Sequence, residues 1–296
     1  MAETSHYRKM SVSVVIVSFN TRELLLECLG AIEDHHEVIV VDNASSDGSG
    51  DAVARAYPNV TMIRNPKNVG FGSANNQGLA LARHDPVLLL NSDARPEQGA
   101  IDALAAVLDD DAVVAAGGRL QHPDGSLQES ACNALTLWAV LCEQLFLERI
   151  FRGSKLFNSY WVSGRLPQGG EVEQVMGACL MMRNVERFDE RFFLYCEDTE
   201  FCKRLRKRGR IVYHPAAVFT HALGASSTGN RWRSVAYYNR GKELYFSIHH
   251  GPIHAAACFL INRLGAFLRI IAGAFVLNKA RIFWRVLFAP VNPYPR

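Results

Sequence analysis

A tripeptide of amide, hydroxyl and carboxylate side chains, Asn91-Ser92-Asp93, directly follows the apolar run 86–90. Mg²⁺ and Mn²⁺ prefer oxygen ligands and commonly use one or two carboxylates, with phosphate and water completing the shell. The tripeptide therefore suits a divalent cation that holds a diphosphate. The structural alternative is a simple turn, since Asn, Ser and Asp are all good turn residues.

Two further polar loops carry groups that suit a nucleotide. Asp42 ends a strand-like run, where its carboxylate can accept hydrogen bonds from a base NH or a ribose hydroxyl, whereas Asp47 and Ser49 are better placed to cap the next helix. The segment 68–76 is rich in glycine, which permits close backbone approach to an anionic ligand at a helix start. Asn75 stands where a GxGxxG motif has its third glycine, which disfavours a dinucleotide-dependent oxidoreductase.

The segment 191–204 is the richest in acid–base groups, because Glu197, Asp198 and Glu200 open a predicted helix. The helix dipole stabilises each acidic side chain at such a position by only ~0.3–1 kcal/mol, so capping accounts for one or two of the three. Aromatic residues immediately before the acids would partly desolvate one carboxylate. Desolvation raises a carboxyl pKa, which suits that group to act as a general base.

His221 is the one histidine for which the sequence suggests a chemical role. It follows a strand-like run and precedes a Gly/Ser turn, a position that suits a metal ligand or a phosphate contact. The alternative is a histidine with a purely structural role. His214, which precedes Pro215, is interpreted as structural.

Alternating strands and helices over residues 11–117 must position these groups. Strands are expected at 12–17, 38–41, 60–63, 86–90 and 112–116, and helices at 22–32, 51–56, 72–82 and 97–108. Continuous apolar strands separated by helices predict an α/β fold, with a mixed, mainly parallel sheet covered by helices on both faces. Ligands of such sheets bind outside the carboxyl ends of the strands, where the polar residues collect.

Composition excludes several classes of protein. The 296 residues are 49% hydrophobic and 21% charged, which excludes disorder and a coiled coil. A formal net charge of +3 is too small to indicate nucleic-acid binding. The seven cysteines form no CxxC pair, so buried thiols are expected rather than a disulfide framework or a zinc site. The polar N-terminus lacks the apolar region of a secretory signal, which predicts a cytoplasmic location.

The last 53 residues of the chain differ from the rest in their charge. After Glu243 there is no acidic residue, while cations continue to the end: Arg263, Arg269, Lys279, Arg281, Arg285 and Arg296. Two arginines within the best apolar window disfavour a clean membrane span, at ~2.5–3.5 kcal/mol each. We expect amphipathic helices on an anionic membrane surface, with their cations toward the headgroups. The alternatives are helices packed on the domain and a dimer interface.

Five segments, in this order and spacing, resemble the family 2 inverting glycosyltransferases, which have the GT-A fold. They are residues 15–20, 41–48, 68–76, 90–93 and 188–198. The resemblance extends over roughly 11–251. The loop 68–76 and the ending His221-x-x-Gly224-x-Ser226 are similar to a bacterial rhamnosyltransferase-like subgroup.

The resemblance implies a role for each matching position. Ser18, Asn20 and Asp42 would contact the nucleoside of a nucleotide-sugar donor. Further donor-binding positions are Asn43, Asn68, Gly70, Asn75, Asn91 and Ser92. Asp93 would ligate Mg²⁺ or Mn²⁺ on the diphosphate, with His221 as a second ligand. Asp198, with Glu197 beside it, would deprotonate the acceptor hydroxyl. Asn91 replaces the first aspartate of the DxD motif, so one charge is missing at the metal.

The function implied is metal-dependent sugar transfer with inversion, from a donor such as dTDP-L-rhamnose to a cell-envelope glycan or lipid-linked acceptor. Hexosyl transfer from a UDP- or GDP-sugar is the alternative within the class, and a non-catalytic nucleotide-binding scaffold the alternative outside it. We expect a catalytic domain at 1–251, with a nucleotide-sugar half (11–117) and an acceptor half (118–251). A basic tail at 252–296 would attach it peripherally to the inner face of the cell membrane.

Overall fold

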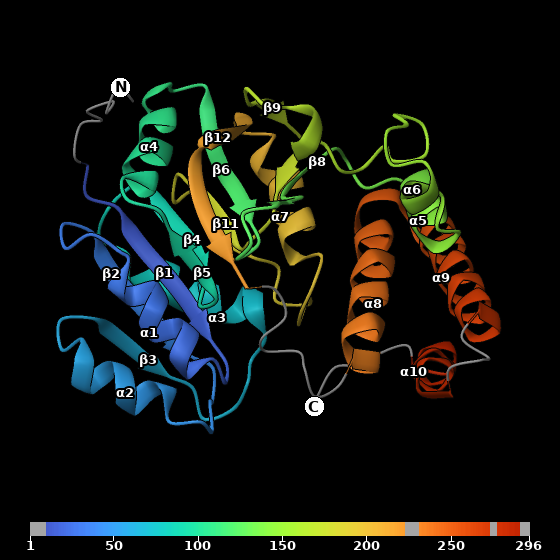
Figure 1. Cartoon of the computed structure of the whole chain (residues 1–296), viewed down its shortest axis with the longest axis horizontal. Helices are drawn as coiled ribbons and strands as arrows, with labels where there is room; N and C mark the ends of the chain where they lie inside the picture. The colour runs from blue at the N-terminus through green and yellow to red at the C-terminus, as the bar shows by residue number, and fades with distance from the viewer. Residues whose placement is uncertain (1–9, 223–230, 273–276, 291–296) are drawn as a thin grey trace.

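Helices flank a large twisted sheet, and a group of further helices stands to one side of it (Figure 1). This computed structural model describes residues 10–222, 231–272 and 277–290. The main sheet has the strand order β3-β2-β1-β4-β11-β6-β12-β5. Gly224 and Ser226, which the sequence resemblance includes, lie outside the described residues.

The first four strands of the chain are parallel neighbours. They are β1 (Ser13–Ser18), β2 (Glu37–Asp42), β3 (Thr61–Arg64) and β4 (Val87–Asn91). Alternate residues of β1 enter two different cores. Val14 and Ile16 pack with Leu25 of α1 (Arg22–Gly30) in one core, while Val15 packs with Leu79 of α3 (Phe71–Leu81) in the other. Burial on both faces explains why the strand is apolar throughout.

The second half of the sheet is mixed. β11 (Cys179–Met182) is antiparallel to both β4 and β6 (Val113–Gln121), while β12 (Arg210–His221) runs parallel to β6. β5 (Ala94–Pro96) and β9 (Gly170–Val172) pair antiparallel with β12, and β7 (Leu127–Gln128) pairs with β6. β8 (Ala131–Cys132) and β10 (Gln174–Val175) form a separate pair. The predicted mixed, mainly parallel sheet is confirmed.

The helices of the sheet layers are α1 (Arg22–Gly30), α2 (Ser49–Ala56), α3 (Phe71–Leu81), α4 (Ala100–Ala106) and α7 (Glu197–Leu205). The helix predicted at 97–108 begins only at Ala100, because residues 97–99 form the turn that follows β5, with Gly99 in a left-handed conformation at φ 75°. Thr21 occupies the N-cap of α1, but its side chain makes no capping hydrogen bond. Its hydroxyl contacts those of Ser18 and Ser92, at 3.1 and 2.8 Å.

A helical group lies beside the sheet and contains α5 (Leu137–Gln144), α6 (Leu147–Ile150), α8 (Arg231–His250), α9 (Pro252–Ala272) and α10 (Leu277–Leu287) (Figure 1). Tyr245 and Phe246 of α8 share one apolar core with Cys258 of α9 and Phe192 of the segment before α7. The helices after residue 230 are therefore packed into the protein. The predicted tail begins with α9, which shares this core with α8 of the preceding segment.

The two arginines of α9 point toward the protein, contrary to the expectation that they would face lipid headgroups. Arg263 donates to the backbone carbonyls of Val286 and Ala289, and Arg269 donates to the carbonyl of Gln144 at 3.2 Å. These carbonyls lie at or near the C-terminal ends of α10 and α5, where partial negative charge attracts a cation. Each guanidinium also stacks on an aromatic ring, Phe259 and Phe146 respectively.

Candidate active site

Asn91, Asp93 and His221 meet where β4 and β12 end. His221 Nε2 lies 3.1 Å from Asp93 Oδ1 and 3.3 Å from Asn91 Nδ2. The backbone holds this corner together, because Ala222 N donates to Asp93 O at 3.0 Å and His221 pairs with Ala94 across β12 and β5. The side chains of His221 and Asp93 are nine-tenths or more buried. Two residues 128 positions apart in the chain thus share one corner.

Gln128 on β7 contacts the other ring nitrogen of His221, because its amide oxygen and amide nitrogen lie 3.1 and 3.0 Å from Nδ1. When Nδ1 donates to the amide oxygen, the lone pair of Nε2 faces Asp93 and is free to bind a cation. The donor set fits a divalent cation, since cis ligands of octahedral Mg²⁺ lie about 2.9 Å apart. Gln128 would orient the ring in the way that outer-shell partners orient metal-bound histidines. No sequence pattern marked it, because it lies on a two-residue strand.

The predicted donor-binding loops are joined by the side chain of Asn43, which follows β2. Asn43 Nδ2 donates to Asn68 Oδ1 at 2.9 Å and to Gly70 O at 3.2 Å, and Asn43 Oδ1 accepts from Val69 N at 3.0 Å. Gly70 has φ +93° and its Cα faces Phe193, so that an added Cβ would lie 2.6 Å from Phe193 O. A larger residue would push apart the glycine-rich loop and the segment before α7.

Asn20 and Asp42 shape the loop beyond the ends of β1 and β2. Asn20 is exposed, with φ 55°, and its Oδ1 accepts from Ser46 N at 2.8 Å. Asp42 is buried, and its Oδ1 accepts from Ser45 N at 2.9 Å. Both side chains therefore lie at the predicted edge and already order the loop that would face a nucleoside.

Three of the predicted donor-binding side chains point into the protein. Asn75 is 1% exposed, and its amide donates to Phe71 O within α3. Ser18 and Ser92 are also buried, and their hydroxyls contact Thr21. Ser18 and Ser92 therefore contribute their backbones, rather than their side chains, to the ends of β1 and β4, and Asn75 stabilises α3.

The acidic pair Glu197-Asp198 begins α7 immediately after a strained turn. Tyr195 and Cys196 both have left-handed backbone conformations, with φ 73° and 66°, although neither is glycine. Such strain costs roughly 1–3 kcal/mol per residue and is concentrated at functional sites. The turn aims the Asp198 carboxylate at the segment before β11, where Asp198 Oδ2 accepts from Gly177 N at 3.1 Å.

Asp198 and the tripeptide 91–93 lie on either side of one short segment. Gly177 N donates to Asp198, and the next residue, Ala178, accepts through its carbonyl from Asn91 N at 3.1 Å. The predicted base and the predicted metal corner are therefore neighbours across two residues. A side chain at Gly177 would crowd the ring of Phe71, with the added Cβ 3.2 Å from Phe71 Cε1.

Burial dominates the electrostatics of the acidic pair. It raises the pKa of Glu197 well above its usual range, and the neighbouring Asp198 carboxylate raises it further. Glu197 Oε2 is buried with no hydrogen-bond partner in the described part of the chain. Burial also raises the pKa of Asp198, while backbone hydrogen bonds from Gly177 and Thr199 oppose that rise. A carboxyl with a raised pKa is a stronger base once it has lost its proton.

Glu197→Gln is expected to stabilise the protein at pH 8, with a gain that shrinks toward pH 5. Because the pKa of Glu197 is higher in the folded than in the unfolded protein, its protonated side chain contributes stability to the wild type below the unfolded pKa, ~4.3. This contribution is lost as the pH rises through the folded pKa, and glutamine, which does not titrate, avoids that loss. Each tenfold change in proton affinity between the two states corresponds to about 1.4 kcal/mol. Thermal unfolding across this pH range measures the gain, with the exposed Glu190→Gln as the control. A gain that does not depend on pH would contradict the raised pKa.

The mixed sheet with helices on both faces is the GT-A fold. A mannosyltransferase of Pyrobaculum calidifontis, solved in complex with GDP-Man and Mn²⁺, matches 92% of this chain and 78% of its own with a TM-score of 0.54 and 18% identity. Residues 1–349 of Staphylococcus aureus TarS, in complex with UDP-GlcNAc, match 95% of this chain and 83% of their own with a TM-score of 0.53 and 17% identity.

The chain belongs to glycosyltransferase family 2, whose family model, "Glycosyl transferase family 2", matches residues 13–161. It is similar to an N-acetylglucosaminyl-diphospho-decaprenol L-rhamnosyltransferase of Mycobacterium tuberculosis, at 28% identity over 238 residues, covering 74% of this chain and 77% of the relative. It is also similar to glycosyltransferase AglE of Haloferax volcanii, at 26% identity over 42% of this chain and 45% of the relative. The chain is thus a rhamnosyltransferase-like transferase.

Proposed function

We propose that this glycosyltransferase moves L-rhamnose, with inversion and with a divalent cation, from dTDP-L-rhamnose to a lipid-linked acceptor that carries a sugar diphosphate. The observation that carries the proposal is the segment Gly177-Ala178, which hydrogen-bonds on one side to Asp198 and on the other to Asn91. The name of the mycobacterial relative, which specifies L-rhamnose and N-acetylglucosaminyl-diphospho-decaprenol, supports this choice of donor and acceptor.

Each side chain has a distinct task in this proposal. Asn20, Asp42 and the loop ordered by Asn43 would receive the nucleoside, while Asp93 and His221 would hold Mg²⁺ or Mn²⁺. When bound, such a cation neutralises charge that grows on the leaving diphosphate. Asp198, held by two backbone NH groups, would take the proton from the acceptor hydroxyl as its oxygen attacks the anomeric carbon opposite the diphosphate. Attack from that side inverts the configuration.

A stripe of exposed apolar side chains supports attachment to the membrane that holds such an acceptor. It runs along α9 through Ile253, Leu260, Leu264, Phe267 and Ile271, which are 44–82% exposed. Trp284 and Phe288, at the end of α10, add to the exposed apolar surface. By length and composition α9 also qualifies as a membrane span. The two arginines of α9 are hydrogen-bonded to neighbouring helices and so do not face the membrane. We propose that the apolar stripe lies in the membrane–water interface of the inner face, where the exposed Arg281 and Arg285 contact anionic headgroups.

The combined variant Leu260→Glu, Phe267→Glu, Ile271→Glu is expected to bind anionic phosphatidylglycerol vesicles at least tenfold more weakly. Each such side chain contributes up to ~1.5–3 kcal/mol when it leaves water, and tenfold corresponds to ~1.4 kcal/mol. Vesicle cosedimentation measures the partition. Leu81→Glu with Val185→Glu, exposed on the sheet domain, is the control. Unchanged partition of the triple variant would contradict the proposed surface.

A donor screen with the purified full chain tests the proposed activity. We expect dTDP-L-rhamnose to raise the unfolding temperature only when Mg²⁺ or Mn²⁺ is present, with ~2.7 kcal/mol of stabilisation at a hundredfold excess over Kd. Transfer to N-acetylglucosaminyl-diphospho-polyprenol, followed by mass spectrometry, then tests the acceptor. Stabilisation by a UDP- or GDP-sugar instead would support the hexosyltransferase alternative. Stabilisation by a nucleotide sugar without transfer to any acceptor would support the non-catalytic nucleotide-binding scaffold.

A further inference from the structure

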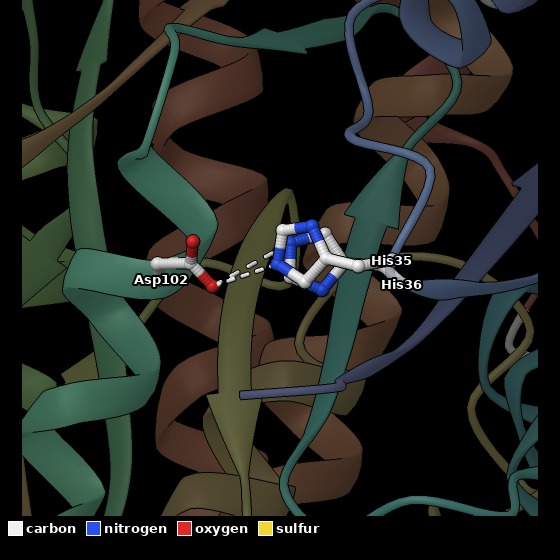
Figure 2. A group of neighbouring side chains, drawn as sticks. All are labelled: His35, His36 and Asp102. Carbon is white, nitrogen blue, oxygen red and sulfur yellow. Dashed lines mark hydrogen bonds and ion pairs between the residues drawn. The ribbon is translucent and has the colours of Figure 1, made fainter. Parts of the chain in front are cut away.

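Two histidines and a carboxylate meet at the end of the parallel strands opposite the acids of the active site. His35 and His36 lie between α1 and β2, directly before β2 begins at Glu37, and Asp102 lies in the first turn of α4. Figure 2 shows the two imidazole rings overlapping, with the Asp102 carboxylate pointing at their nitrogens. β2 separates this cluster from Asp42 by six residues, roughly 20 Å at ~3.3 Å per residue.

The distances between the ligand atoms of this cluster suit a cation with tetrahedral coordination. Asp102 Oδ1 lies 3.1 Å from His35 Nε2 and 3.8 Å from His36 Nε2, and the three ligand atoms are all within 4.8 Å of one another. Glu33 Oε2 lies 3.7 Å from His36 Nε2. Bonds of ~2.0–2.2 Å to Zn²⁺ place tetrahedral ligands about 3.3–3.6 Å apart, inside the range of these separations.

The unpaired ring nitrogens of His36 are a second, independent indication of a bound cation. Its side chain is fully buried, yet neither ring nitrogen has a hydrogen-bond partner within the residues that the structure describes. Glu33 Oε2 is likewise buried and without a hydrogen bond there. An unpaired buried polar group costs about 1–3 kcal/mol. A cation bound beside His36 Nε2 and Glu33 Oε2 would remove that cost for both atoms.

We propose that His35, His36 and Asp102 bind a structural divalent transition metal, with the fourth coordination position beside Glu33. Two imidazoles and one carboxylate favour Zn²⁺ as that metal. Imidazole nitrogen and carboxylate oxygen are both ordinary zinc ligands. The site contains no cysteine, so the cysteine spacing gave no indication of it. The proposal does not depend on the proposed function, because these residues lie away from the donor corner.

Zinc bound in this cluster would hold two segments of the fold together. Glu33 Oε1 already accepts from Gly99 N at 2.8 Å, directly before α4. A cation shared between His35, His36 and Asp102 would fasten the connection before β2 onto the start of α4. Unlike the cation proposed at Asp93, this one would be held without a nucleotide.

Zinc binding to the untagged, chelator-treated full chain tests the proposal in the absence of nucleotide. Titration against a chromophoric zinc chelator should show one site that remains in Asp93→Ala. Affinity should fall at least tenfold in His35→Gln and in Asp102→Asn, as losses around zinc sites do, and stay unchanged in His254→Gln, an exposed histidine. Zinc should also raise the unfolding temperature of the wild type by roughly 5 °C at a hundredfold excess over Kd.

X-ray absorption at the zinc edge of the wild-type protein keeps the test decisive if a variant fails to fold. Two imidazole ligands with oxygen completing the shell would support the site. Loss of zinc binding in Asp93→Ala would place the ion at the donor corner and overturn the proposal. Equal zinc affinity in wild type, His35→Gln and Asp102→Asn, or no binding at all, would also overturn it.

Discussion

Asp198→Asn is expected to lower kcat by at least a hundredfold, the lower end of the ~10²–10⁴-fold that a positioned general base contributes. Asparagine keeps the size of the side chain and an oxygen that can accept from Gly177 N, but it cannot take a proton from an acceptor hydroxyl. Donor affinity should stay within about twofold of the wild type, because the donor contacts lie beyond β1, β2 and β4. Steady-state transfer and donor titration measure the two quantities separately.

Glu190→Gln serves as the control for the loss of an acid in the same region. Glu190 is exposed and accepts a hydrogen bond from Asn76 at 3.1 Å, eight residues before Asp198. We expect its kcat to remain close to the wild-type value. Near-normal turnover in Asp198→Asn would remove the assignment of Asp198 as the base, whatever the donor affinity.

Asp93→Ala is expected to reduce kcat/KM by roughly a hundredfold or more, and to abolish the dependence of donor binding on the cation. Asp93 is the only carboxylate of the Asn91-Ser92-Asp93 tripeptide, so its loss leaves His221 and neutral Asn91 to hold a divalent ion. Stabilisation of developing charge by a cation is worth several kcal/mol, and each ~1.4 kcal/mol is tenfold in rate. Thermal shifts with donor, with and without Mn²⁺, measure the coupling.

The matched control for this charge is Asp111→Asn. Asp111 is fully exposed on the sheet domain and pairs with Arg183, so its removal should leave both kinetics and cation dependence unchanged. If Asp93→Ala bound donor with the same cation dependence as the wild type, Asp93 would have no role as a ligand.

The sheet could be predicted from sequence wherever burial on both faces makes a strand continuously apolar. β1 through β4 lie within one or two residues of their expected bounds. The strands of residues 170–182 could not be predicted in this way, because this segment is divided into β9, β10 and β11, which pair with different partners. Where such a segment breaks into separate strands depends on which distant strands pair with it, and the local pattern of hydrophobic residues does not indicate those partners.

The chemical groups of the site could be predicted by type, but the orientation of their side chains could not. Asp93, His221 and Asp198 were recognisable because carboxylates and a histidine stood at strand and helix ends. Asn75 looked equally polar, yet its amide is enclosed within α3. Gln128 and the pair His35-His36 gained meaning only when residues far along the chain, His221 and Asp102, came beside them.

Phosphorus NMR relaxation of the bound donor in the presence of Mn²⁺ tests the central claim most directly, because paramagnetic broadening falls steeply with distance. We predict strong broadening of both phosphorus signals of dTDP-L-rhamnose in wild-type protein and in Asp198→Asn, and its loss in Asp93→Ala. Broadening that is the same in Asp93→Ala as in the wild type would contradict a diphosphate held at the ends of β4 and β12.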